Sequence, residues 1–497
     1  MRPPRLRPGL TQIAILLLAA AINLFHIDRP ALWNDEGFSF FAAQSGLSHA
    51  ISFIAEDTQP PLYYLTLSLW LGLGTSVFVI RALSAAAMTL AIVPVHAAAR
   101  RLFGEKTALL ASFLFAIAPL GLTWAQKARP YPLQLLLVAC AFWGFVRVWH
   151  AGNQTIGAGL RQSFRQRRLS PASSDLGWFA YAVGGAFAML AQSPAGFFLL
   201  GCNIAMALRI LPAIGRNRIL LMNWIGAQIV LILIWMLWLP MFVHQVASHL
   251  TAAQIASRHP LFLVSFTQVL GTLQGLFGVA ALWRPAPVFL ALCLGIAIAA
   301  ILHIIRHRRQ AWPLLVVILA PIAVCLAAFF LLHPVFGYVI YTFVWMLVPY
   351  SILLAAGILA IRPAPLRWAA LAFLLLGDTW GLKNVYQTGT PPLDRVAAVI
   401  RTNQAPGDGI VFSDTASGRF AIAYYLGAPY GAMPGLGITE QGTDRLITSL
   451  SETNELRRVW VVLIDGETPA IDLDALRRTR HATLSQRVGD FQIIRYE

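Results

Sequence analysis

The chain has 497 residues, of which 58% are hydrophobic and only 12% are charged, and its mean hydropathy is +0.67. A soluble globular protein of this length would carry about 25% charged residues, so the composition excludes that class. The formal net charge of +16 does not indicate nucleic acid as a partner. The arginines lie in short clusters between apolar runs, as the positive-inside rule distributes them in membrane proteins. The sequence predicts an α-helical polytopic membrane protein.

The N-terminus is expected in the cytoplasm, because Arg2, Arg5 and Arg7 precede the first apolar run at residues 10–27. No A-x-A-like cleavage site follows this run, so we interpret it as an uncleaved helix that crosses outward. The polar interruption that follows, Asp28 to Tyr64, would then lie outside.

This interruption, the acidic loop, concentrates carboxylates in a chain that has few of them. Of the 21 acidic residues, 13 lie beyond Lys383, and five of the remaining eight are in this loop: Asp28, Asp35, Glu36, Glu56 and Asp57. Residues 38–55 are amphipathic and predict a helix along the membrane interface. Residues 61–73 are apolar but too short to span a bilayer comfortably. The acidic loop is therefore the candidate active site.

The arginine clusters orient the later apolar runs. We expect crossings at residues 78–98, 107–124, 132–148, 177–192, 195–210, 219–241, 286–305, 312–332, 339–361 and 368–382. The Arg-containing loop 149–175 would be cytoplasmic, and residues 263–282 are either interfacial or re-entrant. With the first run, this gives roughly eleven crossings and a transmembrane domain over residues 1–382.

The composition changes to that of a soluble domain after Lys383. Strands are predicted at residues 409–413, 459–464 and 491–496, and helices near 417–426, 441–452 and 470–479. This order indicates a small α/β domain over residues 383–497, outside the membrane. It has no Gly-rich phosphate loop after a strand, so no chemistry is assigned to it.

Asp35 and Glu36 lie at the outer mouth of the first helix, flanked by Trp33 and Phe38. A carboxylate at a partly desolvated membrane surface has a raised pKa, which suits a general base. The alternative is a solvated pair that only marks the membrane boundary.

Residues 57–64 combine an acid, two prolines and two aromatic residues. Pro60 and Pro61 fix the chain beside Asp57, and Tyr63 and Tyr64 follow at interface depth. The same pattern also fits the start of an interfacial helix, with Asp57 as a capping residue.

A short external turn at residues 126–131 carries Lys127 and Arg129, against the positive-inside trend. External cations suit phosphate binding. They could instead pair with the nearby carboxylates or with lipid headgroups. Histidines 244, 249 and 259 lack metal-ligand spacing, and we expect a loop role for them.

Four motifs in order carry a family resemblance: W-x-D-E ending at Glu36, D-x-x-P-P-L-Y-Y at residues 57–64, R-x-L-F-G ending at Gly104, and W-x-Q-x-A-R-x-Y at residues 124–131. Together they resemble the bacterial members of the protein O-mannosyltransferase family, within the GT-C superfamily of membrane glycosyltransferases, which also includes aminoarabinose transferases. The resemblance covers roughly residues 10–360.

The resemblance implies an inverting hexosyl- or pentosyltransferase of a bacterial inner membrane, with its site at the periplasmic face. It would take a sugar from a polyprenyl-phosphate carrier and pass it to a lipid, glycan or protein acceptor. By the family pattern Asp35 is the catalytic base and Glu36 completes its motif, while other residues bind the donor or line the cavity: Asp57, Gln59, Tyr63, Tyr64, Lys127, Arg129 and Tyr131. No cofactor is expected. A divalent metal at Asp35 and Asp57 would be conceivable but is not expected.

The chain departs from the family pattern at three places. Lys127 stands where members usually have Glu, Gln59 where they often have His, and residues 333–350 lack the usual arginine. These departures keep open a relative that has lost its chemistry or a membrane protein that binds or transports carrier lipids. A transporter would favour inverted repeats and charges on broken membrane helices.

Overall fold

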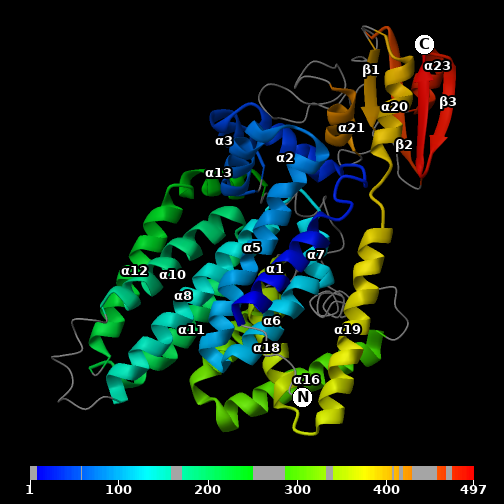
Figure 1. The fold of residues 1–497 in the computed structure, drawn as a ribbon. Coiled ribbons are helices and arrows are strands. Elements are labelled where there is room, and N and C mark those ends of the chain that lie inside the picture. Colours follow the sequence, from blue (N-terminus) through cyan, green and yellow to red (C-terminus); the bar gives the residue numbers. More distant parts are fainter. Residues whose placement is uncertain are drawn as a thin grey trace. The chain divides into compact units, whose positions relative to one another are not determined.

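The computed structural model describes residues 8–57, 59–157, 171–215, 217–249, 286–331, 340–405, 408–412, 418–427, 456–465 and 473–497. They form two compact units (Figure 1). The first unit comprises Met1–Phe25, Ser84–Gln126 and Pro130–Val385, and the second comprises His26–Leu83, Lys127–Arg129 and Tyr386–Glu497. The predicted boundary at residue 383 stays a prediction, because the second unit also includes segments from the first third of the chain.

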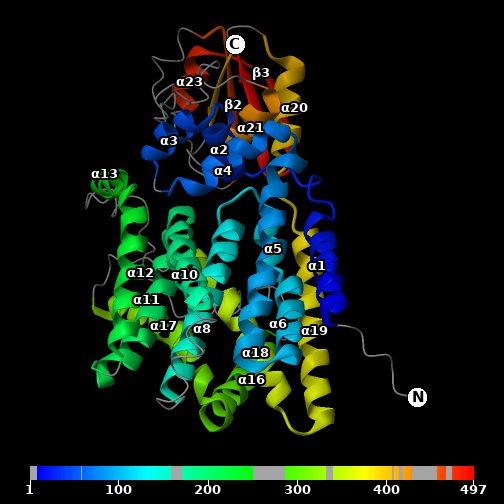
Figure 2. The ribbon, with the colours of Figure 1, turned by 60° about the vertical axis from the view of Figure 1, so that its left-hand side comes forward.

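Helices make up the first unit (Figure 2), because a chain surrounded by lipid must satisfy its backbone hydrogen bonds within each segment. In chain order they are α1 (Pro8–Leu24), α5 (Val77–Phe103, from residue 84 on), α6 (Glu105–Ile117), α7 (Pro119–Ala125), α8 (Tyr131–Gly157), α10 (Pro171–Ala191), α11 (Ala195–Ile210), α12 (Arg218–Met236), α13 (Leu239–His249), α16 (Ala286–His307), α17 (Trp312–Leu331), α18 (Leu347–Ala360) and α19 (Ala364–Gln387). Short 3₁₀ segments occur at Leu211–Ala213, Arg309–Ala311 and Ile340–Met346.

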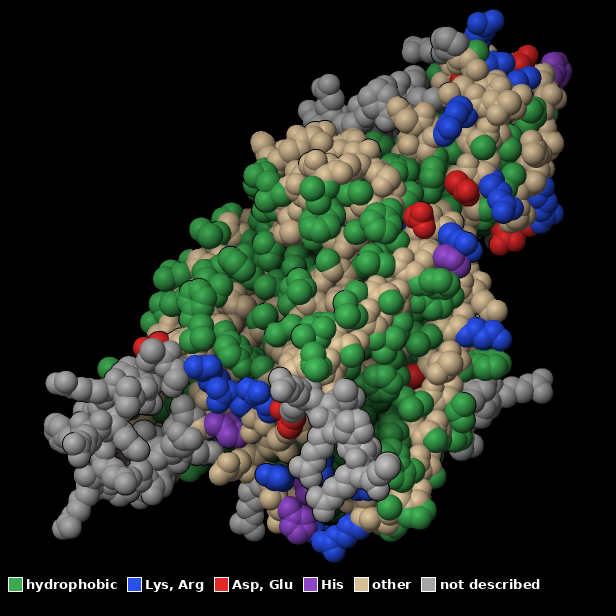
Figure 3. Space-filling model, viewed as in Figure 1, with side chains coloured by type: hydrophobic (Ala, Val, Ile, Leu, Met, Phe, Trp, Pro, Cys, Tyr) green, Lys and Arg blue, Asp and Glu red, His purple; other side chains and the backbone are tan. Residues whose placement is uncertain are grey.

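The predicted class, a multi-pass helical membrane protein, is confirmed. Hydrophobic side chains cover the visible face of this helical unit (Figure 3). On α12, Ile219, Met222 and Leu233 are each more than half exposed, as expected of side chains that contact lipid. Among the described residues five helices are long and apolar enough to span a membrane, or six with one bent pair, so the count of eleven is not confirmed.

The bent pair corrects the prediction of a single helix over residues 107–124. Helix α6 ends at Ile117, and α7 begins at Pro119 at an angle of 54°. Proline has no N–H for the helical hydrogen bond and its ring clashes with the preceding turn, so the helix breaks there.

Small residues allow the helices of the first unit to approach closely. A Cβ on Gly144 of α8 would lie 2.6 Å from the carbonyl oxygen of Gly177 on α10, and one on Gly184 of α10 would lie 3.1 Å from the backbone nitrogen of Ala141. Such stripes of small residues drive helix association in membranes through close packing.

The acidic loop and the apolar run after it form short helices in the second unit: α2 (Asn34–Gln44), α3 (Leu47–Ala55), α4 (Leu62–Trp70) and the 3₁₀ segment Leu71–Leu73. The prediction of one helix over residues 38–55 is wrong. The chain leaves the helix at Ser45, and Gly46 has a φ of +95°, a conformation that glycine adopts at little cost. This glycine separates α2 from α3.

The C-terminal segment forms the predicted α/β domain. Its sheet has the order β1–β2–β4–β3, with β1 (Asp408–Phe412) parallel to β2 (Arg458–Ile464) and the other pairs antiparallel. The strands near 409–413, 459–464 and 491–496 are confirmed, the last as β4 (Phe491–Tyr496), and the helices near 417–426 and 470–479 are α21 (Arg419–Leu426) and α23 (Leu473–Thr479). The predicted helix at 441–452 lies outside the described residues.

Two elements of this domain were not predicted. Strand β3 (Ala482–Val488) is an edge strand whose side chains are mostly exposed, so its sequence lacks the apolar alternation of a half-buried strand. Helix α20 (Leu393–Asn403) does bury an apolar stripe, formed by Leu393, Val396, Ala397 and Ile400, at helical spacing.

Helices α2 and α21 pack closely at Gly37. A Cβ at this position would lie 2.5 Å from the backbone nitrogen of Ala421 and 2.5 Å from the backbone carbon of Phe420. We therefore expect Gly37→Ala to lower the free energy of unfolding by about 1–3 kcal/mol through overpacking. The helix propensity that alanine gains, about 1 kcal/mol, is too small to offset this loss fully.

Thermal unfolding of the purified chain measures this effect. Gly72→Ala is the matched control, because nothing lies within 4 Å of its added Cβ. Equal melting temperatures for the Gly37 variant and this control would contradict the close packing of α2 on α21.

Candidate functional site

The second unit brings together most of the predicted site residues. Asp35 and Glu36 lie in the first turn of α2, Tyr63 and Tyr64 in the first turn of α4, and Lys127 and Arg129 on the turn that belongs to the same unit. Tyr131, by contrast, is the first residue of α8 in the first unit, where its ring packs on Trp124 with 4.1 Å between centroids.

Glu36 is a fully buried carboxylate whose oxygens are occupied by donors. Its side chain is 0% exposed and accepts hydrogen bonds from Nε and Nη2 of Arg81, both at 2.7 Å. It also accepts from the backbone N–H groups of Ala128 at 2.9 Å and Trp33 at 3.0 Å. A carboxylate held by four donors and closed to solvent is suited to fix the loop and the turn relative to each other.

Arg81, near the start of α5, uses all five of its N–H donors. Besides Glu36, its guanidinium donates to three backbone carbonyls at the start of the acidic loop and just before it: Ile27 at 2.7 Å, Pro30 at 2.8 Å and Ala31 at 2.9 Å. A guanidinium has five donors in a fixed planar arrangement, so it can tie several parts of a loop to one point.

Arg81 was not singled out from the sequence, although a signal was present. It is a lone arginine near the start of the apolar run at residues 78–98, where a crossing was expected. Ionisable residues in such runs pair with a partner when they are buried. The sequence could not say that Glu36, 45 residues away, is that partner.

Asp35, next to Glu36, is the more accessible acid of the pair. Its side chain is 37% exposed, and its Oδ2 lies 3.4 Å from Nη2 of Arg129, whose own side chain is only 9% exposed. Nη1 of Arg129 also donates to the backbone carbonyl of Asp35 at 3.3 Å. The structure thus places an accessible carboxylate beside a largely buried cation. The sequence left open whether the cations of the turn pair with nearby carboxylates, and Arg129 does so.

Lys127 lies beside the same carboxylates. Its Nζ is 4.8 Å from the centroid of the Trp33 ring, a cation–π contact. Burial lowers the pKa of Lys127 below its ordinary value of 10.5, while the negative charge of Glu36 opposes this shift. Together with Arg129, Lys127 gives the site two cations near its accessible acid.

The start of α4 forms an aromatic wall. Tyr63 and Tyr64 are fully buried, and the ring of Tyr64 meets that of Phe38 edge to face at 5.9 Å. Burial raises the pKa of the Tyr64 hydroxyl far above its usual range, partly offset by Arg129 and reinforced by Asp57 and Asp35. These three charged groups therefore all lie near one tyrosine. Gln59 and Asp57 are half-buried.

The C-terminal domain contributes to the same unit, which the sequence did not indicate. The hydroxyl of Tyr425 accepts a hydrogen bond from the N–H of Leu32 at 2.7 Å, and Asn34 Oδ1 accepts from the N–H of Phe420 at 3.0 Å. The ring of Phe420 also packs on that of Phe38 at 5.4 Å. The domain thus supports the residues on either side of Asp35.

In the described part of the chain, no group of three or more His, Cys, Asp or Glu side chains could hold a metal ion. The expectation that no metal or cofactor is needed stays a prediction. Of the histidines at 244, 249 and 259, only the first two fall on described residues, in α13.

Comparisons with known proteins agree with the motifs found in the sequence. The family model described as dolichyl-phosphate-mannose-protein mannosyltransferase matches residues 58–161. No curated protein matches the chain significantly.

Solved structures share the fold over almost the whole chain. ArnT from Cupriavidus metallidurans in the apo state has a TM-score of 0.64 at 14% identity, over 98% of this chain and 97% of ArnT. ArnT bound to undecaprenyl phosphate has a TM-score of 0.61 at 13% identity with the same coverage. The archaeal oligosaccharyltransferase AglB from Archaeoglobus fulgidus, in complex with an inhibitory peptide and a dolichol-phosphate, has a TM-score of 0.52 at 13% identity, over 91% of this chain and 69% of AglB.

The fold is thus that of ArnT: a multi-pass helical membrane protein with the GT-C architecture that the motifs predicted. Within that class the chain resembles ArnT and the protein mannosyltransferases, as its motifs predicted.

Proposed function

We propose that this chain is a glycosyltransferase that moves a hexose or pentose from a polyprenyl-phosphate donor to a lipid, glycan or protein acceptor. The observation that carries the proposal is the juxtaposition of Asp35, a partly exposed carboxylate, with Arg129, a largely buried cation, at 3.4 Å. A reaction that takes a proton from one oxygen and releases a phosphate needs these two charges side by side.

In the proposed mechanism Asp35 takes the proton of the acceptor's nucleophilic group as that group attacks the anomeric carbon. The bond between this carbon and the carrier's phosphate oxygen breaks, and the configuration inverts. Arg129 and Lys127 stabilise the charge that develops on the departing polyprenyl phosphate. Glu36 and Arg81 do not react; they hold the acidic loop against the turn that carries the two cations.

The proposal places the reaction at the periplasmic face of a bacterial inner membrane, with the N-terminus in the cytoplasm. Its support is the arginine distribution of the sequence and the polyprenyl-type phosphates bound by ArnT and AglB. Reporter fusions in the loop 149–175 and after residue 400 test this topology, and a periplasmic signal from the first fusion would contradict it.

Sugar transfer can be tested with the purified full-length chain in lipid nanodiscs. The assay supplies polyprenyl-phosphate-linked hexoses and pentoses with an envelope extract from a strain that lacks the protein, and it measures labelled product and free polyprenyl phosphate. We expect one carrier-linked sugar to be consumed. Carrier binding without consumption of any sugar would instead support the carrier-lipid-binding alternative.

The pH dependence of transfer should report on Lys127. Because burial lowers its pKa, Lys127 loses its charge, and the site loses a cation, at a lower pH than an ordinary lysine would. We expect kcat/KM to fall on the alkaline side below pH 10.5, the ordinary lysine value. Lys127→Arg, which stays charged throughout, should shift or remove this decline.

Lys127→Gln is the control for this profile: it should lower kcat/KM at the pH values where Lys127 is charged and approach the wild type where Lys127 is neutral. If the arginine and glutamine variants gave the same profile, the charge at position 127 would have no role in transfer.

A further inference from the structure

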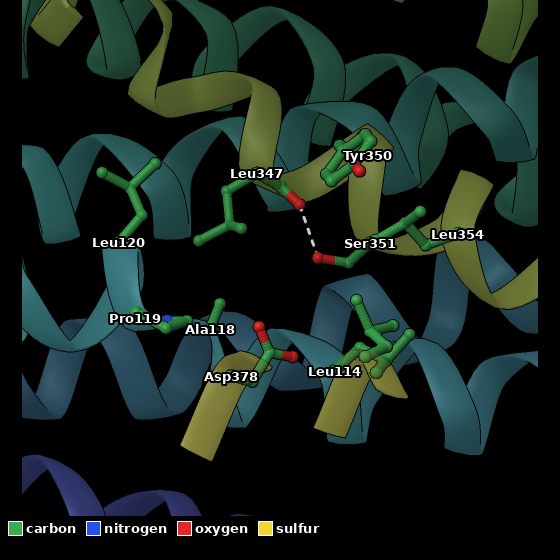
Figure 4. A pocket seen from close by; sticks show the side chains of 10 residues that line it. Leu114, Ala118, Pro119, Leu120, Leu347, Tyr350, Ser351, Leu354 and Asp378 are labelled. Carbon is green, nitrogen blue, oxygen red and sulfur yellow. Dashed lines mark hydrogen bonds between the residues drawn. The ribbon is translucent and has the colours of Figure 1, made fainter. Parts of the chain in front are cut away.

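A second acidic position lies in the first unit, on a segment other than the acidic loop. Asp378 is on α19, inside the segment predicted as the last crossing, and it is only 6% exposed. It lines a small pocket between α6, α7, α18 and α19, part of which is open to the outside. Figure 4 shows its carboxyl group directed into this pocket.

Within the described part of the chain, Asp378 has no ion pair and no hydrogen bond from a side chain. Seven of the ten lining residues carry no charge or hydroxyl group, and the polar side chains besides Asp378 are Tyr350 and Ser351. Burying a carboxylate without a partner costs free energy, so its negative charge has to be balanced by a bound cation or removed by a proton. Ionisable residues inside membrane segments are usually functional for this reason.

The break between α6 and α7 adds a second attraction for positive charge. Leu114, in the last turn of α6, lines the pocket together with Ala118 and Pro119 at the break. The last carbonyl groups of a helix lack partners within the helix, and the negative end of the helix dipole lies there. Broken membrane helices hold Na⁺ or H⁺ in transporters through such carbonyls.

Ser351 provides a further oxygen. Its hydroxyl donates to the backbone carbonyl of Leu347 at 2.7 Å, so its proton is engaged and its oxygen keeps lone pairs that can bind a cation (Figure 4). Hydroxyl, carboxylate and carbonyl oxygens are the ligands that hard cations prefer.

We propose that this pocket binds one small monovalent cation, an alkali-metal ion or ammonium, through Asp378. A single carboxylate balances a single positive charge, whereas calcium sites use several carboxylates and carbonyls. The site is separate from the proposed glycosyl-transfer chemistry and does not depend on it.

Carbodiimide labelling tests the proposal on the full-length chain in nanodiscs. Dicyclohexylcarbodiimide modifies protonated carboxyl groups in apolar surroundings, and peptide mass spectrometry follows its addition to Asp378. We expect Na⁺, K⁺, Li⁺ or NH₄⁺ to slow the labelling saturably, with N-methylglucamine keeping the ionic strength constant. At ten times the dissociation constant the rate should fall about tenfold, because the fraction of unoccupied sites is 1/(1 + [L]/Kd).

Two variants sharpen the test. Ser351→Ala should raise the cation concentration needed for protection. Thr379→Val is its matched control, because the Thr379 hydroxyl donates to the Leu375 carbonyl of its own helix and its side chain is exposed outside the pocket. Thermal unfolding gives a second readout: the wild type should be stabilised by the protecting cation, and Asp378→Asn should not.

Labelling that responds to pH but to none of the four cations would overturn the proposal, since Asp378 would then simply be protonated. If Asp378 is not labelled at all, the cation-dependent shift in melting temperature becomes the test. Equal shifts for the wild type and Asp378→Asn would overturn the proposal. If Asp378→Asn does not fold, the Ser351 and Thr379 variants decide, and equal protection of both would count against the site.

Discussion

Replacing Asp35 by asparagine is expected to lower kcat for sugar transfer by about 10²–10⁴-fold, the usual contribution of a general base. Asparagine keeps the size of the side chain but cannot accept the acceptor's proton. The fold should survive, because the Asp35 side chain is 37% exposed and its main partner Arg129 also donates to the backbone carbonyl of residue 35. Transfer from the carrier-linked sugar, measured with the purified variant, gives the effect.

Asp28→Asn is the matched control for this experiment. Asp28 is an exposed acid of the same loop, so its loss should leave kcat nearly unchanged. An Asp35→Asn variant that retained wild-type kcat would remove Asp35 from the mechanism.

Replacing Glu36 by glutamine is expected to lower the free energy of unfolding by about 3–5 kcal/mol. Arg81 would then remain buried and charged without its carboxylate partner, which is the costly way to break a buried ion pair. Because Glu36 also receives the N–H of Ala128, the turn with Lys127 and Arg129 should loosen, and transfer should fall with stability. Thermal and denaturant unfolding measure the first effect.

An exposed ion pair in the same unit gives the comparison. Arg477 and Asp474 are 3.1 Å apart with side chains 56% and 80% exposed, so Arg477→Gln should destabilise the fold far less than Glu36→Gln, because exposed ion pairs contribute little. If the Glu36 and Arg477 variants unfolded alike, the buried pair would not be what holds the loop. A double variant with Arg81→Met should be less destabilised than the sum of its two single variants, because it leaves no charge unpaired.

Much of the architecture could be predicted from periodicity and charge. Long apolar runs specify helices strongly, so the crossings near residues 78–98 and 132–148 correspond to α5 and α8. Breaks within an apolar run are harder to see, because Gly46 and Pro119 act through local backbone geometry. Strand β3 is held by its pairing with β4, and its own sequence carries no apolar signal.

The candidate site was predicted only in part. The excess of acids in one loop and of cations on one external turn indicated that the two belong together, and Arg129 does lie beside Asp35. Pairwise contacts between distant segments could not be predicted, because one sequence contains no record of which residues meet. This applies to Arg81 with Glu36 and to Phe420 with Asn34.

The hydrogen bonds between the acidic loop and the C-terminal domain have a consequence for biogenesis. Residues 31–34 receive their partners from Thr390, Phe420 and Tyr425, which the ribosome makes more than 350 residues later. The loop therefore cannot make these contacts until nearly the whole chain has been synthesised. Maturation of the site should coincide with release of the finished polypeptide, so a nascent chain stalled before residue 390 would carry an incomplete one.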